Sequence, residues 1–220
     1  MARRGRAYAP RGKVTNGRTQ RASVGVAEHG NSAVLVTVAR GGELLDRRRV
    51  DLTEPGLPTH PHHHEGSWAV GRYLNTPGAR ALPLAEVVAL VERVRASAAR
   101  GARESLEAVA AAVRVPIASI ALRACPTLPP TVEERIADNR AQTVADTVMY
   151  REALAAAAEA RGWQVYWYDK ERVFRDAAAR LGGEDIDAFL QAMGRAIGLS
   201  WQAKHKLAAV AALAAAAQPV

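Results

Sequence analysis

The stretch VGVAEHGNSAVLVTVARGGELL, from Val24 to Leu45, decides the fold of this 220-residue chain. In it, runs of β-branched and other apolar residues alternate with two turn-forming segments, HGN at 29–31 and RGGE at 40–43. Apolar runs bounded by Gly and Asn predict strands that are joined by tight turns. We therefore predict an antiparallel meander, with the third and most polar strand nearer an edge. Its strands are expected at residues 23–28, 33–39 and 44–52.

Helical and strand-like patterns alternate through the remainder of the chain. Pro83 opens a helix whose apolar residues recur at helical spacing as far as Val113, with a weak point expected at Gly101. Residues 164–168 (QVYWY) are apolar on both faces, which is typical of a central strand covered by helices on both sides, so we expect their aromatic rings in the core. Another strand is expected at 116–124, helices at 143–161, 170–181 and 184–197, and a last helix capped by Ser200.

Composition excludes several classes of protein. The one cysteine rules out a disulfide framework, and no run approaches the roughly 18 uncharged apolar residues of a membrane span. The first 21 residues carry seven basic residues and no acid, whereas the rest is nearly neutral with 23 basic and 22 acidic residues. We expect residues 1–22 to form a basic, disordered tail and 23–220 a single domain with a long loop at 53–82. The start lacks the apolar segment of a signal peptide, so we expect a cytoplasmic protein without membrane contact.

The order β-β-β-α-β-α-β-α resembles that of the ribonuclease-H-like superfamily, which includes ribonuclease H, Holliday-junction resolvases of the RuvC type and many transposases. The resemblance covers about residues 23–217 and depends on the element order and on the opening hairpin between Val24 and Leu45. It implies a three-layer α/β fold, in which a mixed five-stranded sheet has helices on both faces. The actin-like fold opens with a similar hairpin, but this chain is too short for its two duplicated lobes.

The resemblance also implies a nuclease site, in which carboxylates hold Mg²⁺ or Mn²⁺ for phosphodiester hydrolysis. The family places its first acid on strand one, and Glu28 stands at the end of that strand here. Asp138 and Asp146, near the start of the helix that follows strand four, are the next candidate metal ligands. The family's last ligand, an acid or a histidine, comes from the final helix, where His205 is the candidate. Glu28, Asp146 and His205 are therefore the candidate catalytic residues.

Three departures from the family pattern leave a second hypothesis open. Strand one carries Glu where Asp is usual, strand four carries Arg123 and Cys125 in place of an acid, and lysines flank His205. Cations repel a metal but hold phosphate well. A binding or scaffold module that keeps the fold without catalysis is therefore the alternative to a nuclease.

A histidine-rich segment, residues 60–65 (HPHHHE), supports a third hypothesis. Pro58 and Pro61 favour an extended backbone, in which His62 and His64 project to the same side. With Glu65 these two imidazoles would bind zinc, manganese or another borderline metal. The chain would then be a metal enzyme centred on this loop.

Nucleic acid is the partner that the basic residues indicate, because Lys and Arg bind phosphates through counterion release. The alternative for the tail is a disordered extension that only adds solubility. The candidate contacts lie in the tail, in the polar stretch before the helix expected at 143–161, and on the last helix. They are Arg3, Arg4, Arg6, Arg11, Lys13, Arg18, Arg21, Arg140, Lys204 and Lys206.

Overall fold

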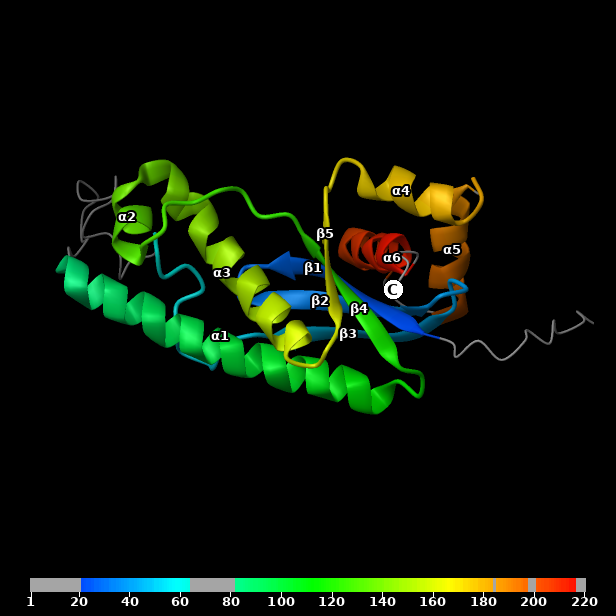
Figure 1. Cartoon of the computed structure of the whole chain (residues 1–220), viewed down its shortest axis with the longest axis horizontal. Helices are drawn as coiled ribbons and strands as arrows, with labels where there is room; N and C mark the ends of the chain where they lie inside the picture. The colour runs from blue at the N-terminus through cyan, green and yellow to red at the C-terminus, as the bar shows by residue number, and fades with distance from the viewer. Residues whose placement is uncertain (1–20, 64–81, 184, 198–200, 217–220) are drawn as a thin grey trace, which may run out of the picture.

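A mixed five-stranded sheet forms the centre of the computed structural model, which describes residues 21–63, 82–183, 185–197 and 201–216 (Figure 1). The strand order is β3-β2-β1-β4-β5. The first three strands pair antiparallel, and β4 and β5 are added parallel to β1. The strands are β1 (Ala22–His29), β2 (Ser32–Ala39), β3 (Leu44–Asp51), β4 (Ile117–Arg123) and β5 (Gln164–Tyr168). This topology confirms the predicted ribonuclease-H-like architecture.

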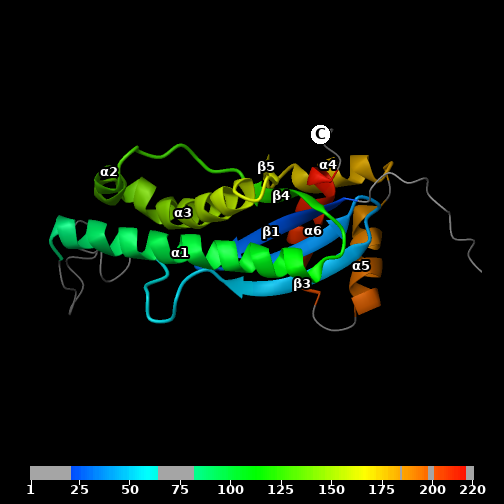
Figure 2. The same ribbon diagram turned by 60° about the horizontal axis from the view of Figure 1, so that its bottom comes forward.

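Helices cover both faces of this sheet (Figures 1 and 2). α1 and α3 run side by side on one face, with α2 at the far end of α3, while α6 lies on the other face beside α4. The helices are α1 (Leu84–Ala112), α2 (Val132–Ala137), α3 (Asn139–Glu159), α4 (Val173–Arg180), α5 (Ile186–Ile197) and α6 (Ala203–Ala215). None of the helices in the described ranges is long and apolar enough to cross a membrane.

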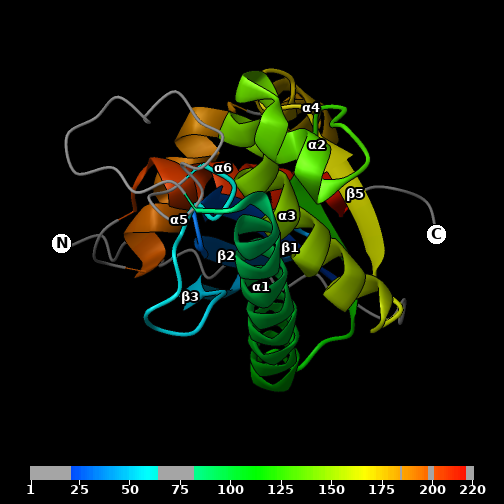
Figure 3. The ribbon, with the colours of Figure 1, turned by 90° about the vertical axis from the view of Figure 1, so that its left-hand side faces the viewer.

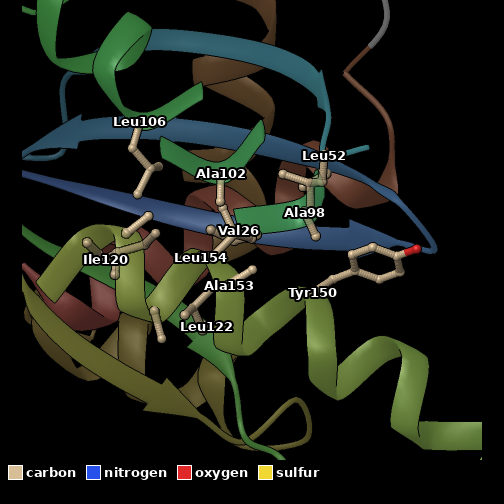
Figure 4. Packing of buried hydrophobic residues seen from close by; sticks show 14 of the residues in the cluster. Val26, Leu52, Ala98, Ala102, Leu106, Ile120, Leu122, Tyr150, Ala153 and Leu154 are labelled. Atoms are coloured by element: carbon tan, nitrogen blue, oxygen red, sulfur yellow. The ribbon is translucent and has the colours of Figure 1, made fainter. Parts of the chain in front are cut away.

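The alternation of β1 and β2 residues divides the core in two. Val26 of β1 and Leu35 of β2 pack toward α1 and α3, whereas Ala27 and Val36 pack toward α6. All four side chains are buried, because strands with helices on both sides need apolar residues at successive positions. Figure 4 shows the α1–α3 side of this core, with the Tyr150 hydroxyl at its margin.

Two glycines set how closely the helices approach the sheet. A Cβ on Gly25 would lie 2.6 Å from the backbone nitrogen of Ala212 and closer still to the carbonyl oxygen of Ala208. A Cβ on Gly101 would lie 2.7 Å from the carbonyl carbon of Leu52. α6 therefore rests directly on β1, and α1 rests on the loop that follows β3.

Gly101 explains one difference from the sequence prediction. α1 continues without a break through Gly101, since the glycine provides room for Leu52 and does not interrupt the helix. A second difference concerns β5, which the sequence predicts as a central strand and which is an edge strand. Its Trp167 is 43% exposed, whereas Tyr168 is buried as expected.

The turn chemistry before α3 accounts for a third difference. The polar segment at 133–142 is not predicted as helical, but it contains α2 and the first turn of α3. Thr131 and Glu134 form a capping box at the start of α2. α6 likewise begins after Gln202 and not after Ser200, which lies outside the described residues.

Candidate functional site

The carboxyl ends of β1 and β4 border an open cavity of about 620 Å³, which α3 closes on one side. Its polar lining consists of Glu28 and His29 from β1, Arg123 and Cys125 from the end of β4, and Thr147 and Arg151 from α3. Among the described residues that line this cavity, Glu28 is the one acidic residue. We call this cavity the cleft.

Glu28 is neutralised within the cleft by Arg151. The Arg151 guanidinium donates to Glu28 Oε1 through Nε at 2.8 Å and also through Nη2, while Nη1 donates to the Ala124 carbonyl at 3.0 Å. The side chains of Arg151 and Glu28 are only 6% and 8% exposed. Such a two-point, shielded contact is one of the strong charge-assisted interactions in proteins.

These residues do not fit the Mg²⁺ or Mn²⁺ site that the sequence resemblance leads one to expect. Hard divalent cations need several oxygen ligands, with at least one or two carboxylates. Here the single carboxylate already pairs with Arg151, and Arg123 lines the same cavity. A cation placed beside Glu28 would therefore be repelled by the guanidinium groups of Arg151 and Arg123. Glu28 as a metal ligand stays a prediction, which the experiments below address.

Cys125 lines the same cleft, and burial raises the pKa of its thiol despite the lowering influence of Arg151. A thiol with a raised pKa is a poor nucleophile.

A second, smaller cavity of about 330 Å³ adjoins the cleft through His29, which lines both. Arg49 of β3 and Lys204 and His205 of α6 line it, together with Gln202. Burial, and secondarily the charge of Arg47, lowers the pKa of His205. The His205 ring stacks on Trp201, with ring centroids 5.6 Å apart, and its Nδ1 accepts a hydrogen bond from the Gln202 backbone N–H at 3.3 Å. His205 thus caps α6 while it faces a basic cavity.

Asp146 lies in a different place, where α3 meets the loop that follows β3. His62 donates to Asp146 Oδ1 from its backbone N–H at 3.0 Å, and its ring Nδ1 lies 2.6 Å from the same oxygen. His63 Nδ1 lies 2.6 Å and His60 Nδ1 3.8 Å from Asp146 Oδ2. Burial raises the pKa of Asp146, but the close contacts of the His62 and His63 rings and the charge of His62 outweigh burial, so the pKa falls below its usual value.

Residues 60–63 of the histidine segment form a turn and not the extended chain that the prolines suggest. The His63 N–H donates to the His60 carbonyl at 3.3 Å, so residues 60–63 form a turn with Pro61 at its second position, where the fixed φ of proline is favoured. The ring centroids of His60 and His63 lie 4.9 Å apart, which the sequence did not predict. His64 and Glu65 lie outside the described residues.

The structure brings some of the predicted site residues together and separates others. Glu28 and Lys204 line adjoining cavities that share His29; burial lowers the pKa of Lys204, and the charge of Glu28 partly opposes this shift. Asp146 and His205 belong to helices on opposite faces of the sheet. Asp138 caps α3, since its Oδ1 accepts from the backbone N–H groups of Arg140 and Ala141 at 2.7 and 2.8 Å.

The remaining predicted contacts lie away from the cleft or outside the described residues. Arg140 is exposed at the start of α3, and Arg21 precedes β1 at the end of the strand opposite to Glu28. Seven residues of strand separate Arg21 from Glu28 by about 24 Å. The basic residues at 3–18 are outside the described chain.

Sequence reasoning missed the roles of Arg151, His60 and His63. Arg151 is the one cation between Arg140 and Arg161 in an alanine-rich helix, and this isolation is the only local sign of its role. His60 and His63 belong to the segment that the sequence singled out, but the extended backbone expected there directed attention to His62 and His64, and the prediction for His64 lies outside the described residues.

Comparisons with known proteins report a likeness of fold. No protein-family model matches the sequence, and no curated protein matches it. Among solved structures, the chain is similar to "T. thermophilus RuvC in complex with Holliday junction substrate", with 16% identity over 88% of this chain and 91% of that chain and a TM-score of 0.45. It is also similar to a Thermus thermophilus RuvC structure, with 15% identity, 88% and 92% coverage and a TM-score of 0.42. Neither likeness identifies a function for this chain.

Proposed function

We propose that this protein binds nucleic acid through the cleft and the adjoining basic cavity, and that it does so without a catalytic metal at Glu28. The buried pair of Glu28 and Arg151 carries the proposal. It occupies the place where the resemblance implies a metal-binding carboxylate, and it leaves the remaining charges of the region cationic.

The distribution of charge supports a polyanionic ligand. Arg123 in the cleft and Arg49, Lys204 and the titratable His205 in the adjoining cavity form one basic surface, joined at His29. Since Arg151 already neutralises Glu28, the net charge of this surface is positive. Phosphates attract such a surface and release counterions when they bind, so the affinity depends steeply on salt.

The position of Lys204 supports phosphate contact in particular. Its side chain is half-buried and lines the smaller cavity, so its ammonium has lost part of its water shell, and this partial burial lowers its pKa. A phosphate oxygen in the cavity would replace that water and stabilise the ammonium.

Binding of labelled single-stranded, duplex, branched and RNA–DNA hybrid molecules at several salt concentrations tests this proposal. The doubly substituted Arg49→Gln, Lys204→Gln protein should bind at least tenfold more weakly. On duplex DNA, the slope of log K against log salt should fall by about 0.9 for each phosphate that the variant no longer neutralises. Arg103→Gln, Arg161→Gln is the matched control, because both arginines line a separate cavity between α1 and α3. Equal weakening by both double substitutions would contradict the proposed surface.

The absence of metal catalysis at Glu28 needs its own measurement. The same substrates are incubated with Mg²⁺ or Mn²⁺, with wild-type protein beside Glu28→Gln. We expect the protein to bind these substrates. We expect no cleavage that requires Glu28. Metal-dependent cleavage that is lost in Glu28→Gln would refute the metal-free part of the proposal and establish the nuclease hypothesis.

A further inference from the structure

We propose that His60, His63 and Asp146 form a binding site for Zn²⁺ or a similar borderline divalent metal. This is the one group of three or more histidine, cysteine or acidic side chains within the described ranges whose donor atoms could share an ion. The proposal uses none of the residues of the basic surface, so it stands or falls independently of the proposed function.

Two elements far apart in the sequence build the site. Asp146 projects from the middle of α3, and His60 and His63 come from the turn at 60–63. The loop before this turn is held on α3 by the Tyr150 hydroxyl, which donates to the Thr59 carbonyl at 2.8 Å. The turn is therefore positioned over Asp146 by contacts that do not involve a metal.

His62 orients the carboxylate toward the other two histidines. Its backbone N–H and ring Nδ1 both hold Asp146 Oδ1, which leaves Oδ2 directed at His60 and His63. A hydrogen-bonded partner of this kind commonly fixes a carboxylate that binds a metal. His62 is thus a positioning residue in this proposal.

Asp146 Oδ2 is the observation that points to a ligand. The side chain of Asp146 is 1% exposed, and its Oδ2 lies 2.6 Å from His63 Nδ1 without the geometry of a hydrogen bond between these two atoms. A buried carboxylate oxygen without such a bond is costly, and natural proteins rarely leave one. A divalent ion bound to Oδ2 would remove that cost.

The donor set and its spacing select the class of metal. Two imidazole nitrogens and one carboxylate oxygen suit zinc and its neighbours better than Mg²⁺, which prefers oxygen ligands alone. The three donor atoms lie within 4.8 Å of one another, and tetrahedral bonds of about 2.0–2.1 Å would place them about 3.3 Å apart after small side-chain rotations. His60 is 42% exposed, so an ion and a water in the fourth position have access from solvent.

Metal titration of the purified full-length protein tests the site. After chelation and desalting, Zn²⁺ binding is measured by calorimetry, and Co²⁺ is added separately to give a visible absorption spectrum that reports coordination number. We expect one ion per chain and a four-coordinate Co²⁺ spectrum. His60→Ala and His63→Ala should each weaken binding by at least about 100-fold, since even indirect partners of metal ligands cost 10–100-fold.

Controls separate this site from its alternatives. His29→Ala and His205→Ala, which alter histidines outside the cluster, should bind Zn²⁺ like the wild type. The proposal would be overturned if stoichiometric Zn²⁺ binding survived both His60→Ala and His63→Ala. It would also be overturned if binding were lost only in the double variant His64→Ala, Glu65→Gln, or if the wild type bound no stoichiometric Zn²⁺. Because His60 is partly exposed, its variant is expected to fold, and circular dichroism verifies that it does.

Discussion

Arg151 and Glu28, 123 residues apart in the chain, form a shielded ion pair at the carboxyl end of β1. The pair joins α3 to the central strand of the sheet, and it converts the one acidic group of the cleft into a neutral unit. The same contact therefore stabilises the fold and determines which ligands the cleft attracts. Removal of the ion pair should therefore change two quantities that can be measured independently, the free energy of unfolding and the affinity for nucleic acid.

Substitution of Arg151 should destabilise the protein strongly. Arg151→Met leaves the Glu28 carboxylate shielded from water without its cation, a change that costs about 3 kcal/mol or more of unfolding free energy. The double substitution Glu28→Gln, Arg151→Met should recover part of this loss, because no unpaired charge remains. Urea unfolding of the wild type, both single variants and the double variant measures the coupling, and strictly additive losses would show that the pair contributes no specific stability.

Asp138 should behave as a helix cap. Its carboxylate accepts two backbone hydrogen bonds at the start of α3, and these bonds lower its pKa. Asp138→Ala should reduce the thermal midpoint, whereas Asp138→Ser should retain most of it, since serine is an equally good cap. Serine lacks the carboxylate that a metal ligand needs. A Ser variant that folds normally but loses a metal-dependent activity would instead support the predicted metal role of Asp138.

The order of strands and helices could be predicted from sequence because the signals for it are local. The turns around Gly30 and Gly42 and the apolar runs beside them are contiguous, and the helical periodicity after Pro83 spans many turns. Local signals were weaker for β5, where apolar residues on both faces suggested a central strand. An edge strand can carry the same residues when Trp167 remains partly exposed.

The candidate sites could not be predicted to the same degree, because they depend on contacts between distant segments. The sequence singled out Glu28, Asp146 and the histidine segment, but it contained no sign that Arg151 would pair with Glu28. Nor did it show that Asp146 would meet His62, which lies 84 residues earlier. The turn after His60, where the prolines indicated an extended chain, brings the rings of His60 and His63 together. Figure 3, which looks from the α2 end of the molecule, shows how the loop after β3 comes beside α3.

Gly25 should be the glycine least tolerant of substitution. Gly25→Ala forces a methyl group into the backbone of α6 at Ala208 and Ala212, which is overpacking against groups that cannot rotate away. We expect a loss on the order of 3 kcal/mol, at the upper end for overpacked cores. Gly41→Ala is the matched control, since a Cβ there meets nothing within 4 Å. Comparable denaturation curves for the two variants would mean that α6 does not rest on β1 as described.

His205 should make both stability and nucleic-acid binding depend on pH. Burial and the charge of Arg47 lower its pKa in the folded protein, and Lys204 and Arg49 line the same cavity. The unfolded chain therefore takes up a proton near pH 6.5 before the folded protein does, so stability falls as the pH drops through and below that value. Protonation of Nδ1 would also end the hydrogen bond from the Gln202 N–H.

His205→Gln isolates this dependence, because glutamine at the same position preserves a capping interaction and does not titrate. The difference in unfolding free energy between pH 7.5 and pH 5.5 should be smaller in the variant than in the wild type. When the pH is lowered from 7.5 to 5.5, the nucleic-acid affinity of the wild type should rise more than that of the variant, since a phosphate in the cavity favours the imidazolium. His29→Gln, which alters the other histidine of the basic surface, is measured in parallel, and an identical change in that variant would assign the pH dependence to the surface as a whole and not to His205.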